Sequence, residues 1–252
     1  MKIVVIGASG RIGKKLLYTL RRDGIMVRAA SPSSGVNTVT GEGLNDALQE
    51  ATVVVDVSNS HSLDGSAALQ FFEISWCNLL AAGKAAGVQR HIALSIVGTD
   101  GLQTIGYFRA KKVQEDLIKD SGIPYSILRS TQFLEFLPQI AEEGAEGDAV
   151  RLSTGLMQPV AAEDVAATVA ELAIGAPAGR VELGGPEALG MDDWARRLFA
   201  ATGDERTVVS DPHARYFGTE LKGGELTPGD GARIGTVDFD AWFATQQQET
   251  AR

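Results

Sequence analysis

The sequence predicts an α/β fold built on a doubly wound parallel sheet, with a smaller lobe toward the C-terminus. A β-branched run at the very start leads directly into glycines and then into a helical pattern. Strand and helix patterns then alternate about every 20 to 30 residues, which is typical of parallel strands joined by helical crossovers. The chain has 252 residues, 44% of them hydrophobic, and is therefore long enough for one such unit with a large core.

The first segment combines a buried strand with a turn that suits phosphate. The residues from Ile3 to Ile6 form a short apolar run that glycine ends at once, which predicts a strand. Gly7, Gly10 and Gly13 follow with the spacing G-x-x-G-x-x-G. They permit the tight turn, the close approach of a pyrophosphate and the packing of the next helix, in that order. That helix, Lys14 to Arg22, offers unpaired N–H groups and a positive dipole end, so the segment predicts half of a Rossmann-type dinucleotide site.

The rest of the first half continues the alternation, with glycine or a Ser/Pro/Gly loop at the boundaries. The expected strands are 25–30, 36–40, 52–57, 90–97 and 124–129. The expected helices are 44–50, 67–87 and 107–121.

Beyond Arg129 the alternation loosens. The expected helices are 133–143 (after a loop), 163–174, 191–202 and a short amphipathic helix that ends the tail 228–248, and the expected strands are 149–154 and 180–183. We therefore expect a Rossmann core over residues 1–130. A substrate-facing lobe over 131–252 is expected to be interwoven with that core rather than to fold separately.

Charge and composition exclude several function classes. The net charge is −9 at pH 7 and no Lys/Arg cluster exceeds two residues, so the basic surface that nucleic acids require is not expected. No apolar run reaches membrane length and no leader-like segment precedes the first strand. The three histidines lack metal-ligand spacing, so no metal is expected. We expect a cytoplasmic monomer or homodimer with a small-molecule partner and no nucleic-acid or membrane partner. Cys77 lies in an apolar helical stretch and is expected to be buried and inert.

The end of the second predicted strand indicates which dinucleotide is preferred. NAD sites usually carry an acidic residue there, on the adenosine ribose, whereas residues 24–41 contain neither Asp nor Glu. A carboxylate would repel a 2′-phosphate, while Arg11 and the hydroxyls of Ser31, Ser33 and Ser34 can bind one. The pattern favours NADP(H) over NAD(H). The residues expected to contact the cofactor from this half are Gly7, Ser9, Gly10, Arg11, Ile12, Gly13, Ser31, Ser33 and Ser34.

Three polar residues further along lie where a reacting group is expected. Ser95 is at the carboxyl end of the strand 90–97, and ligands of open α/β sheets bind at that end. Tyr107 and Lys111 open the next helix four residues apart, which places the phenol and the ammonium on one face. A structural interpretation stays open: Ser95 can cap a strand end, and the other two can belong to a helix whose charged face includes Lys112 and Glu115.

Together with the run Gly122-Ile123-Pro124-Tyr125-Ser126-Ile127-Leu128-Arg129, these motifs resemble the short-chain dehydrogenase/reductase superfamily, and more closely its atypical, NmrA-like branch. The resemblance covers nearly the whole chain, including 159–166 (PVAAEDVA) and 228–233 (PGDGAR). It implies that Tyr107 protonates a substrate carbonyl oxygen during hydride transfer, and that Ser95 hydrogen-bonds the same oxygen. It also implies that Lys111 holds the nicotinamide ribose, and a neighbouring cation is expected to lower the pKa of the phenol.

The resemblance leaves the substrate and one catalytic residue open. The asparagine that completes the catalytic set in the family is not identified, and Asn78 is interpreted as a packing or capping residue. Gln132, Phe133, Phe136 and Leu137 either line an apolar pocket or, for the two phenylalanines, pack between lobes. The resemblance implies an NADP(H)-dependent oxidoreductase acting on a small carbonyl or quinone. The alternative is a regulator that senses the dinucleotide without turnover; an epimerase or dehydratase lacks specific support.

Overall fold

The computed structural model describes the backbone of residues 1–250 and side chains up to residue 248. It divides into two compact units: unit 1 contains 1–129 and 165–181, and unit 2 contains 130–164 and the chain from 182 onward. Residues 165–181, which the sequence analysis assigns to the smaller lobe, thus belong to unit 1.

A seven-stranded sheet confirms the predicted Rossmann-type fold. Its order is β14-β9-β5-β4-β3-β1-β2, and adjacent strands such as β1 and β3 run parallel. The strands are β1 (Ile3–Ile6), β2 (Val27–Ala30), β3 (Val53–Asp56), β4 (Arg90–Ile96), β5 (Tyr125–Ser130), β9 (Gly179–Gly184) and β14 (Arg233–Ile234). The chain passes from β1 to β2 and then returns to pair β3 on the other side of β1. The order therefore reverses at the carboxyl ends of β1 and β3, which is where such sheets bind ligands.

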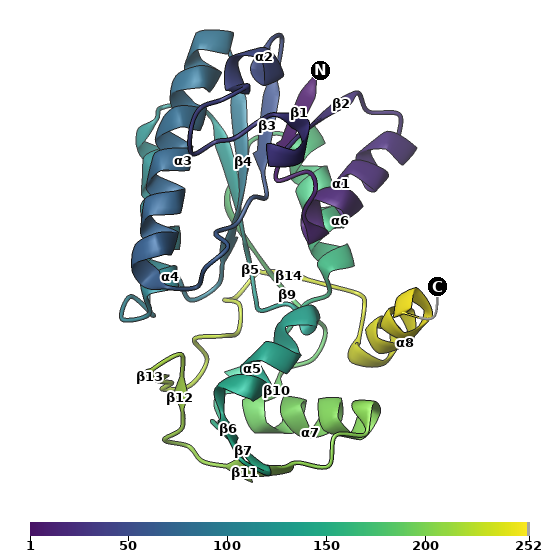
Figure 1. Cartoon of the computed structure of the whole chain (residues 1–252). Coiled ribbons are helices and arrows are strands. Elements are labelled where there is room, and N and C mark those ends of the chain that lie inside the picture. Colours follow the sequence, from purple (N-terminus) through teal and green to yellow (C-terminus); the bar gives the residue numbers. More distant parts are fainter. Residues whose placement is uncertain (251–252) are drawn as a thin grey trace. The chain divides into compact units, whose positions relative to one another are not determined.

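Helices cover both faces of the sheet in unit 1. They are α1 (Arg11–Arg22), α2 (Leu44–Leu48), α3 (Gly65–Ala86), α4 (Gly106–Asp120) and α6 (Ala162–Ile174). Figure 1 shows α3 and α4 on one face and α1 and α6 on the other. Under α3 and α4 the core includes Trp76, Leu79 and Ile118, each at most 1% exposed. All four residues of β1 are buried, which explains its unbroken apolar run.

The first residues of α3 and α4 are in direct backbone contact. A Cβ added to Gly65 would lie 2.6 Å from the Cα of Gly106. Real Cβ contacts are essentially never this short, so the contact requires glycine on both helices.

The predictions for residues 36–40 and for Cys77 in unit 1 are wrong. Residues 36–40 form turns rather than a strand, because the side chain of Asn37 accepts hydrogen bonds from the backbone N–H groups of Val39 and Thr40. Cys77 is exposed rather than buried. The buried stripe of α3 runs through Phe72, Trp76 and Leu79, and Cys77 falls outside it.

Unit 2 is built around a three-stranded sheet in the order β11-β7-β6. Its strands are β6 (Ala145–Glu146), β7 (Ala149–Leu152) and β11 (Thr207–Ser210), and the short ladders are β8 (Leu156–Met157) with β10 (Leu189–Gly190) and β12 (Arg215–Tyr216) with β13 (Thr219–Glu220). The helices are α5 (Leu137–Glu143), α7 (Met191–Thr202) and α8 (Phe239–Thr250). Trp194 anchors α7, because its indole Nε1 donates to the Met157 carbonyl at 2.9 Å. The sequence analysis did not identify β11, a four-residue strand without glycine or proline boundaries.

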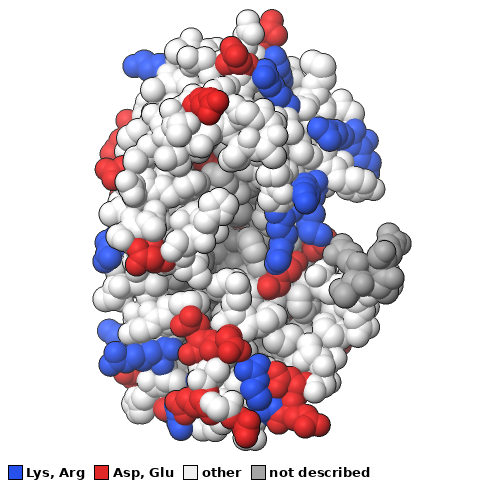
Figure 2. Space-filling view, viewed as in Figure 1, with Lys and Arg blue, Asp and Glu red and all other residues white. Residues whose placement is uncertain are grey.

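Charges of both signs are interspersed on the face that Figure 2 displays, and that face carries no continuous basic surface. Among the described helices, none is long and apolar enough to cross a membrane.

Candidate functional site

The glycine turn between β1 and α1 has the geometry that its spacing predicts. Gly7 has a φ of +78°, and a Cβ there would lie 2.6 Å from the backbone nitrogen of Ser58. A Cβ on Gly13 would lie 2.7 Å from the Cα of Ala8. The first glycine therefore lets the turn approach the chain after β3, and the third lets α1 pack on the turn.

The N-terminus of α1 leaves its first backbone N–H groups available to an anion. Gly10 is the N-cap, no side chain caps the helix and no acidic residue lies in its first turn. The side chain of Ile12 is buried, so this residue can offer only its backbone, while Ser9 and Arg11 are exposed. A phosphate group fits such a helix start, because N–H groups and the helix dipole both attract negative charge.

A buried carboxyl lies beside the turn. Asp56 ends β3 and is 1% exposed; its Oδ1 accepts the backbone N–H of Ser58 at 2.8 Å. Burial raises the pKa of this carboxyl, while hydrogen bonding with the side chains of Ser58 and Trp76 acts in the opposite direction. At this reversal point, the glycine cradle and the uncapped helix start fit a bound dinucleotide.

The three serines after β2 form a tight 3-10 turn, η1 (Pro32–Ser34). Ser34 is engaged in a capping box, in which its hydroxyl donates to the Ser31 carbonyl and accepts the Ser31 N–H, both at 2.9 Å. The hydroxyls of Ser31 and Ser33 lie 2.9 Å apart, and Ser33 is exposed. The structure therefore brings the three serines together in one turn, while Arg11 lies at the start of α1. Their role toward a 2′-phosphate stays a prediction.

Tyr107 lies in the first turn of α4, partly exposed, with its ring edge-on to Phe72 at 6.1 Å between centroids. Its hydroxyl donates to Oδ1 of Asn59 at 2.9 Å. Burial raises the pKa of the phenol above its ordinary value. The expectation that Lys111 would bring this pKa down toward neutral pH is therefore wrong for this structure, because desolvation of the phenolate outweighs the hydrogen bond with Asn59 that opposes it.

Lys111 is 4% exposed and lies beneath Tyr107 rather than open to a ligand. Its ammonium donates to the Leu94 carbonyl and to Oε1 of Gln114, both at 3.0 Å, and sits 3.9 Å from the centroid of the Phe72 ring. The two hydrogen bonds use two of its three donors. Burial lowers the pKa of Lys111 to about 8, although Asp56 and Glu115 attract its charge. Its predicted role at the nicotinamide ribose stays a prediction.

Ser95 joins a buried ion-pair cluster. Its hydroxyl donates to Oε1 of Glu115 at 2.7 Å. Arg129 binds the same carboxylate through Nε at 2.7 Å and Nη2 at 2.8 Å, and also pairs with Asp100 at 2.6 Å. Burial opposes the charge of Glu115, yet the hydrogen bonds from Arg129 and Ser95 hold its pKa below the ordinary value. Glu115, expected on a charged outer face, is fully buried, and Ser95 is bound within the cluster.

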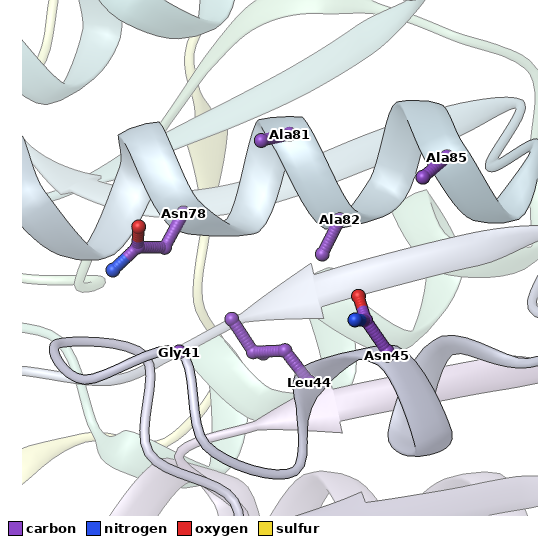
Figure 3. A pocket seen from close by; sticks show the side chains of 7 residues that line it. All are labelled: Gly41, Leu44, Asn45, Asn78, Ala81, Ala82 and Ala85. Carbon is purple, nitrogen blue, oxygen red and sulfur yellow. The ribbon is translucent and has the colours of Figure 1, made fainter.

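Asn78 has a structural role. Its Nδ2 donates to the carbonyls of Thr38 and Val39 at 2.9 and 3.0 Å, which ties the 37–41 turn to α3. Beside it lies a shallow pocket of about 280 Å³ (Figure 3). Small side chains of α3 and the residues around α2 line the pocket, namely Gly41, Leu44, Asn45, Asn78, Ala81, Ala82 and Ala85.

The predicted substrate-side residues lie in unit 2. Gln132 is 3% exposed, and neither atom of its amide has a hydrogen-bond partner among the described residues. Leu137 is buried, whereas Phe133 and Phe136 are partly exposed. Phe136 stacks on Phe217 with ring centroids 6.2 Å apart. In the described chain, no group of three His, Cys, Asp or Glu side chains is placed to hold a metal ion.

Comparisons with curated proteins give two informative relatives. Photosystem II assembly factor Ycf39 of Cyanophora paradoxa is 28% identical over 151 residues, which is 54% of this chain and 47% of that protein. The protein of the same name from Synechocystis sp. is 22% identical over 154 residues, 54% of this chain and 46% of that protein. The chain therefore spans about half the length of the curated relatives it matches.

Solved structures share the fold over almost the full chain. A dTDP-4-dehydrorhamnose reductase of Clostridium acetobutylicum has a TM-score of 0.70 at 18% identity, covering 100% of this chain and 99% of that chain. A UDP-glucose 4-epimerase of Thermus thermophilus, in complex with NAD, has a TM-score of 0.70 at 18% identity and covers 96% of both chains. At these identities the likeness shows the fold.

Residues 7–174 match the family described as NAD(P)H-binding, and this span holds the glycine turn, Ser95, Tyr107 and Lys111. The chain thus belongs to the NAD(P)H-binding family. This membership agrees with the resemblance of its motifs to the atypical, NmrA-like branch of the short-chain dehydrogenase/reductase superfamily.

Proposed function

We propose that this protein is an NADP(H)-dependent oxidoreductase that reduces a small carbonyl or quinone-type substrate, with Tyr107 as the general acid. The observation that carries the proposal is the phenol itself. It is reachable from solvent, and its proton is donated to a carbonyl-type oxygen, Oδ1 of Asn59, at 2.9 Å. It belongs to the same unit as the glycine turn.

In the proposed reduction, Tyr107 and Lys111 have different roles. The reduced nicotinamide, when bound, supplies a hydride to the carbonyl carbon. As the carbon–oxygen π pair moves to oxygen, Tyr107 gives its proton to that oxygen, and the resulting phenolate is reprotonated by water. Tyr107 carries its proton at neutral pH, as a general acid must, because the pKa of a phenol lies well above 7 and burial raises it further. Lys111, over the Phe72 ring, supports the aromatic residues on which Tyr107 rests.

The preference for NADP(H) rests on the end of β2. Residues 24–41 contain no carboxylate, while the hydroxyl of Ser33 and the exposed guanidinium of Arg11 are available for a 2′-phosphate. Fluorescence titration with NADPH and NADH tests this preference, and tighter binding of NADH would count against it.

The test of the reaction is NADPH oxidation in the presence of ketones and quinones, with Tyr107→Phe as the comparison. We expect the variant to retain NADPH binding and to lose about 10²- to 10⁴-fold in kcat, which is the range for removal of a general acid. Unchanged turnover would remove Tyr107 from the mechanism.

A second candidate function is a dinucleotide-sensing regulator that does not turn over. Two observations favour it: two of the three donors of Lys111 are taken by protein groups, and Ser95 is bound to Glu115. The Ycf39 relatives are named as assembly factors rather than as enzymes. Tight NADPH binding without oxidation of NADPH by any acceptor would favour this candidate.

A further inference from the structure

Two hydrogen-bond donors converge on one oxygen at the start of α4. The hydroxyl of Tyr107 donates to Oδ1 of Asn59 at 2.9 Å, and the backbone N–H of Ser60 donates to the same atom at 3.0 Å. Asn59 is exposed, and Tyr107 and Ser60 are partly exposed. A small molecule can therefore reach this oxygen and its donors.

The oxygen that they hold is an amide carbonyl oxygen. A substrate carbonyl presents the same type of acceptor, and paired donors of this kind stabilise the negative charge that develops on it during reduction. A phenol has a single proton, so Tyr107 cannot donate to Asn59 and to a substrate at the same time. A bound substrate must therefore displace the Asn59 side chain.

We propose that Tyr107 O–H and Ser60 N–H form a two-donor binding site for the reacting carbonyl oxygen, and that the Asn59 side chain occupies this site until substrate displaces it. The inference rests on the proposed function of Tyr107 and adds the second donor to it. In this proposal Ser60 N–H, rather than Ser95, gives the second hydrogen bond to the carbonyl oxygen. The resemblance assigns that hydrogen bond to Ser95, but the Ser95 hydroxyl is bound to buried Glu115.

The Tyr107 ring does not depend on Asn59 for its position. Phe72 and Phe108 contact it edge-on, with centroid distances of 6.1 and 6.5 Å. Loss of the Asn59 side chain should therefore free the phenolic proton and leave the ring in place. The effect of removing the Asn59 side chain therefore shows whether Asn59 competes with substrate for the phenolic proton or only orients the phenol.

The first test is Asn59→Ala, assayed with NADPH and 1,4-naphthoquinone. We expect KM for the quinone to fall about two- to tenfold, because one neutral hydrogen bond no longer competes, with kcat nearly unchanged. Asn45→Ala, which truncates another exposed asparagine of unit 1, should change neither constant. A fall in kcat at constant KM would show that Asn59 orients the phenol, and it would overturn the proposal.

The second test compares Ser60→Pro, which lacks the N–H, with Ser60→Ala, which keeps it. The proline variant should have a kcat about 10²-fold below that of the alanine variant, as for the loss of one oxyanion donor. NADPH affinity, measured by fluorescence, checks that both variants fold. Equal kcat values for two folded variants would rule out Ser60 N–H as a donor.

A third measurement decides the inference even if no carbonyl is reduced. The Tyr107 signal in protein labelled with ¹³C at the tyrosine Cζ, assigned with Tyr107→Phe, is followed as 1,4-naphthoquinone is added in the presence of NADP⁺. We expect the signal to shift, and to shift at lower quinone concentration in Asn59→Ala than in wild type. No shift, or the same midpoint in both proteins, would overturn the binding site whether or not the protein is an enzyme.

Discussion

The glycine turn and the first turns of α4 contribute to one proposed site in different ways. At the turn, the function depends on backbone: the absent Cβ atoms of Gly7 and Gly13, and helix N–H groups without side-chain caps. At α4, the function depends on side chains, and their partners come from β4, α3 and the loop after β3. The backbone motif needs only small residues and a close approach to the chain after β3, whereas the side-chain motif acquires its chemistry from the side chains and carbonyls of distant segments.

The two regions also differ in what burial does to charge. Around α4 the chain buries Lys111, Glu115 and Arg129, each at most 4% exposed. Buried charges are costly unless they are paired and fully hydrogen-bonded, so this region is sensitive to the loss of any partner. The residues of the glycine turn itself, 7–13, include no buried ionisable side chain, and the turn is sensitive to added volume instead. Four predictions test this contrast.

The largest effect is expected where a buried charge loses its partner. Glu115→Gln should lower the free energy of unfolding by about 3 kcal/mol, because buried Arg129 then loses its buried counter-charge and keeps only the exposed carboxylate of Asp100. Asp116→Asn, on the exposed Lys112 pair one residue along α4, should cost less than about 1 kcal/mol. Urea unfolding measures both variants, and similar losses would mean that burial does not distinguish the pairs.

The glycine turn should respond to a single methyl group. Gly13→Ala places a Cβ 2.7 Å from the Cα of Ala8, so the cost is expected at the upper end of overpacking, about 2–3 kcal/mol, with loss of NADPH binding. Gly87→Ala is the control, since it has a positive φ but no atom within 4 Å of the added Cβ. It should cost about 1 kcal/mol and retain binding. Normal NADPH affinity in Gly13→Ala would disprove the role of close packing.

Lys111 should give the stability of the protein a distinct pH dependence. Its pKa is about 8 in the folded chain and about 10.4 when unfolded, so the unfolded state binds more protons between these values. This group therefore adds stability as pH rises from about 8 to 10, by about 2 kcal/mol. Urea unfolding at pH 7.5 and 10 should show that increase as a difference between wild type and Lys111→Met. Parallel pH profiles would show that Lys111 is not desolvated.

The smallest effect concerns the exposed guanidinium beside the turn. Arg11→Ala should weaken NADPH binding about tenfold and leave NADH binding nearly unchanged, because only NADPH carries the 2′-phosphate. Fluorescence titration of both dinucleotides measures the ratio. Equal losses for the two would place Arg11 on a group that they share.

This contrast also explains which features of the fold and of the site could be predicted from the sequence. Strand, turn and helix around Gly7–Gly13 follow from local pattern and were predictable, as was the four-residue spacing of Tyr107 and Lys111. The partner of Tyr107 lies 48 residues away and that of Ser95 lies 20 residues away. Only the folded chain brings such residues together, so Asn59 had no signal in the sequence. Cys77 and Glu115 were misassigned because average helix composition does not reveal which face packs on the sheet.

The contact between Gly65 of α3 and Gly106 of α4 restricts how this site can differ among related proteins. Gly65 follows the loop that carries Asn59 and Ser60, and Gly106 immediately precedes Tyr107. Neither glycine offers a side chain to a ligand, yet a methyl group on either would push apart the two helix starts and separate the donors they present. Relatives with bulkier residues at these two positions should therefore have remodelled both helix starts, and a search for shared activity should compare this backbone contact before it compares the polar residues.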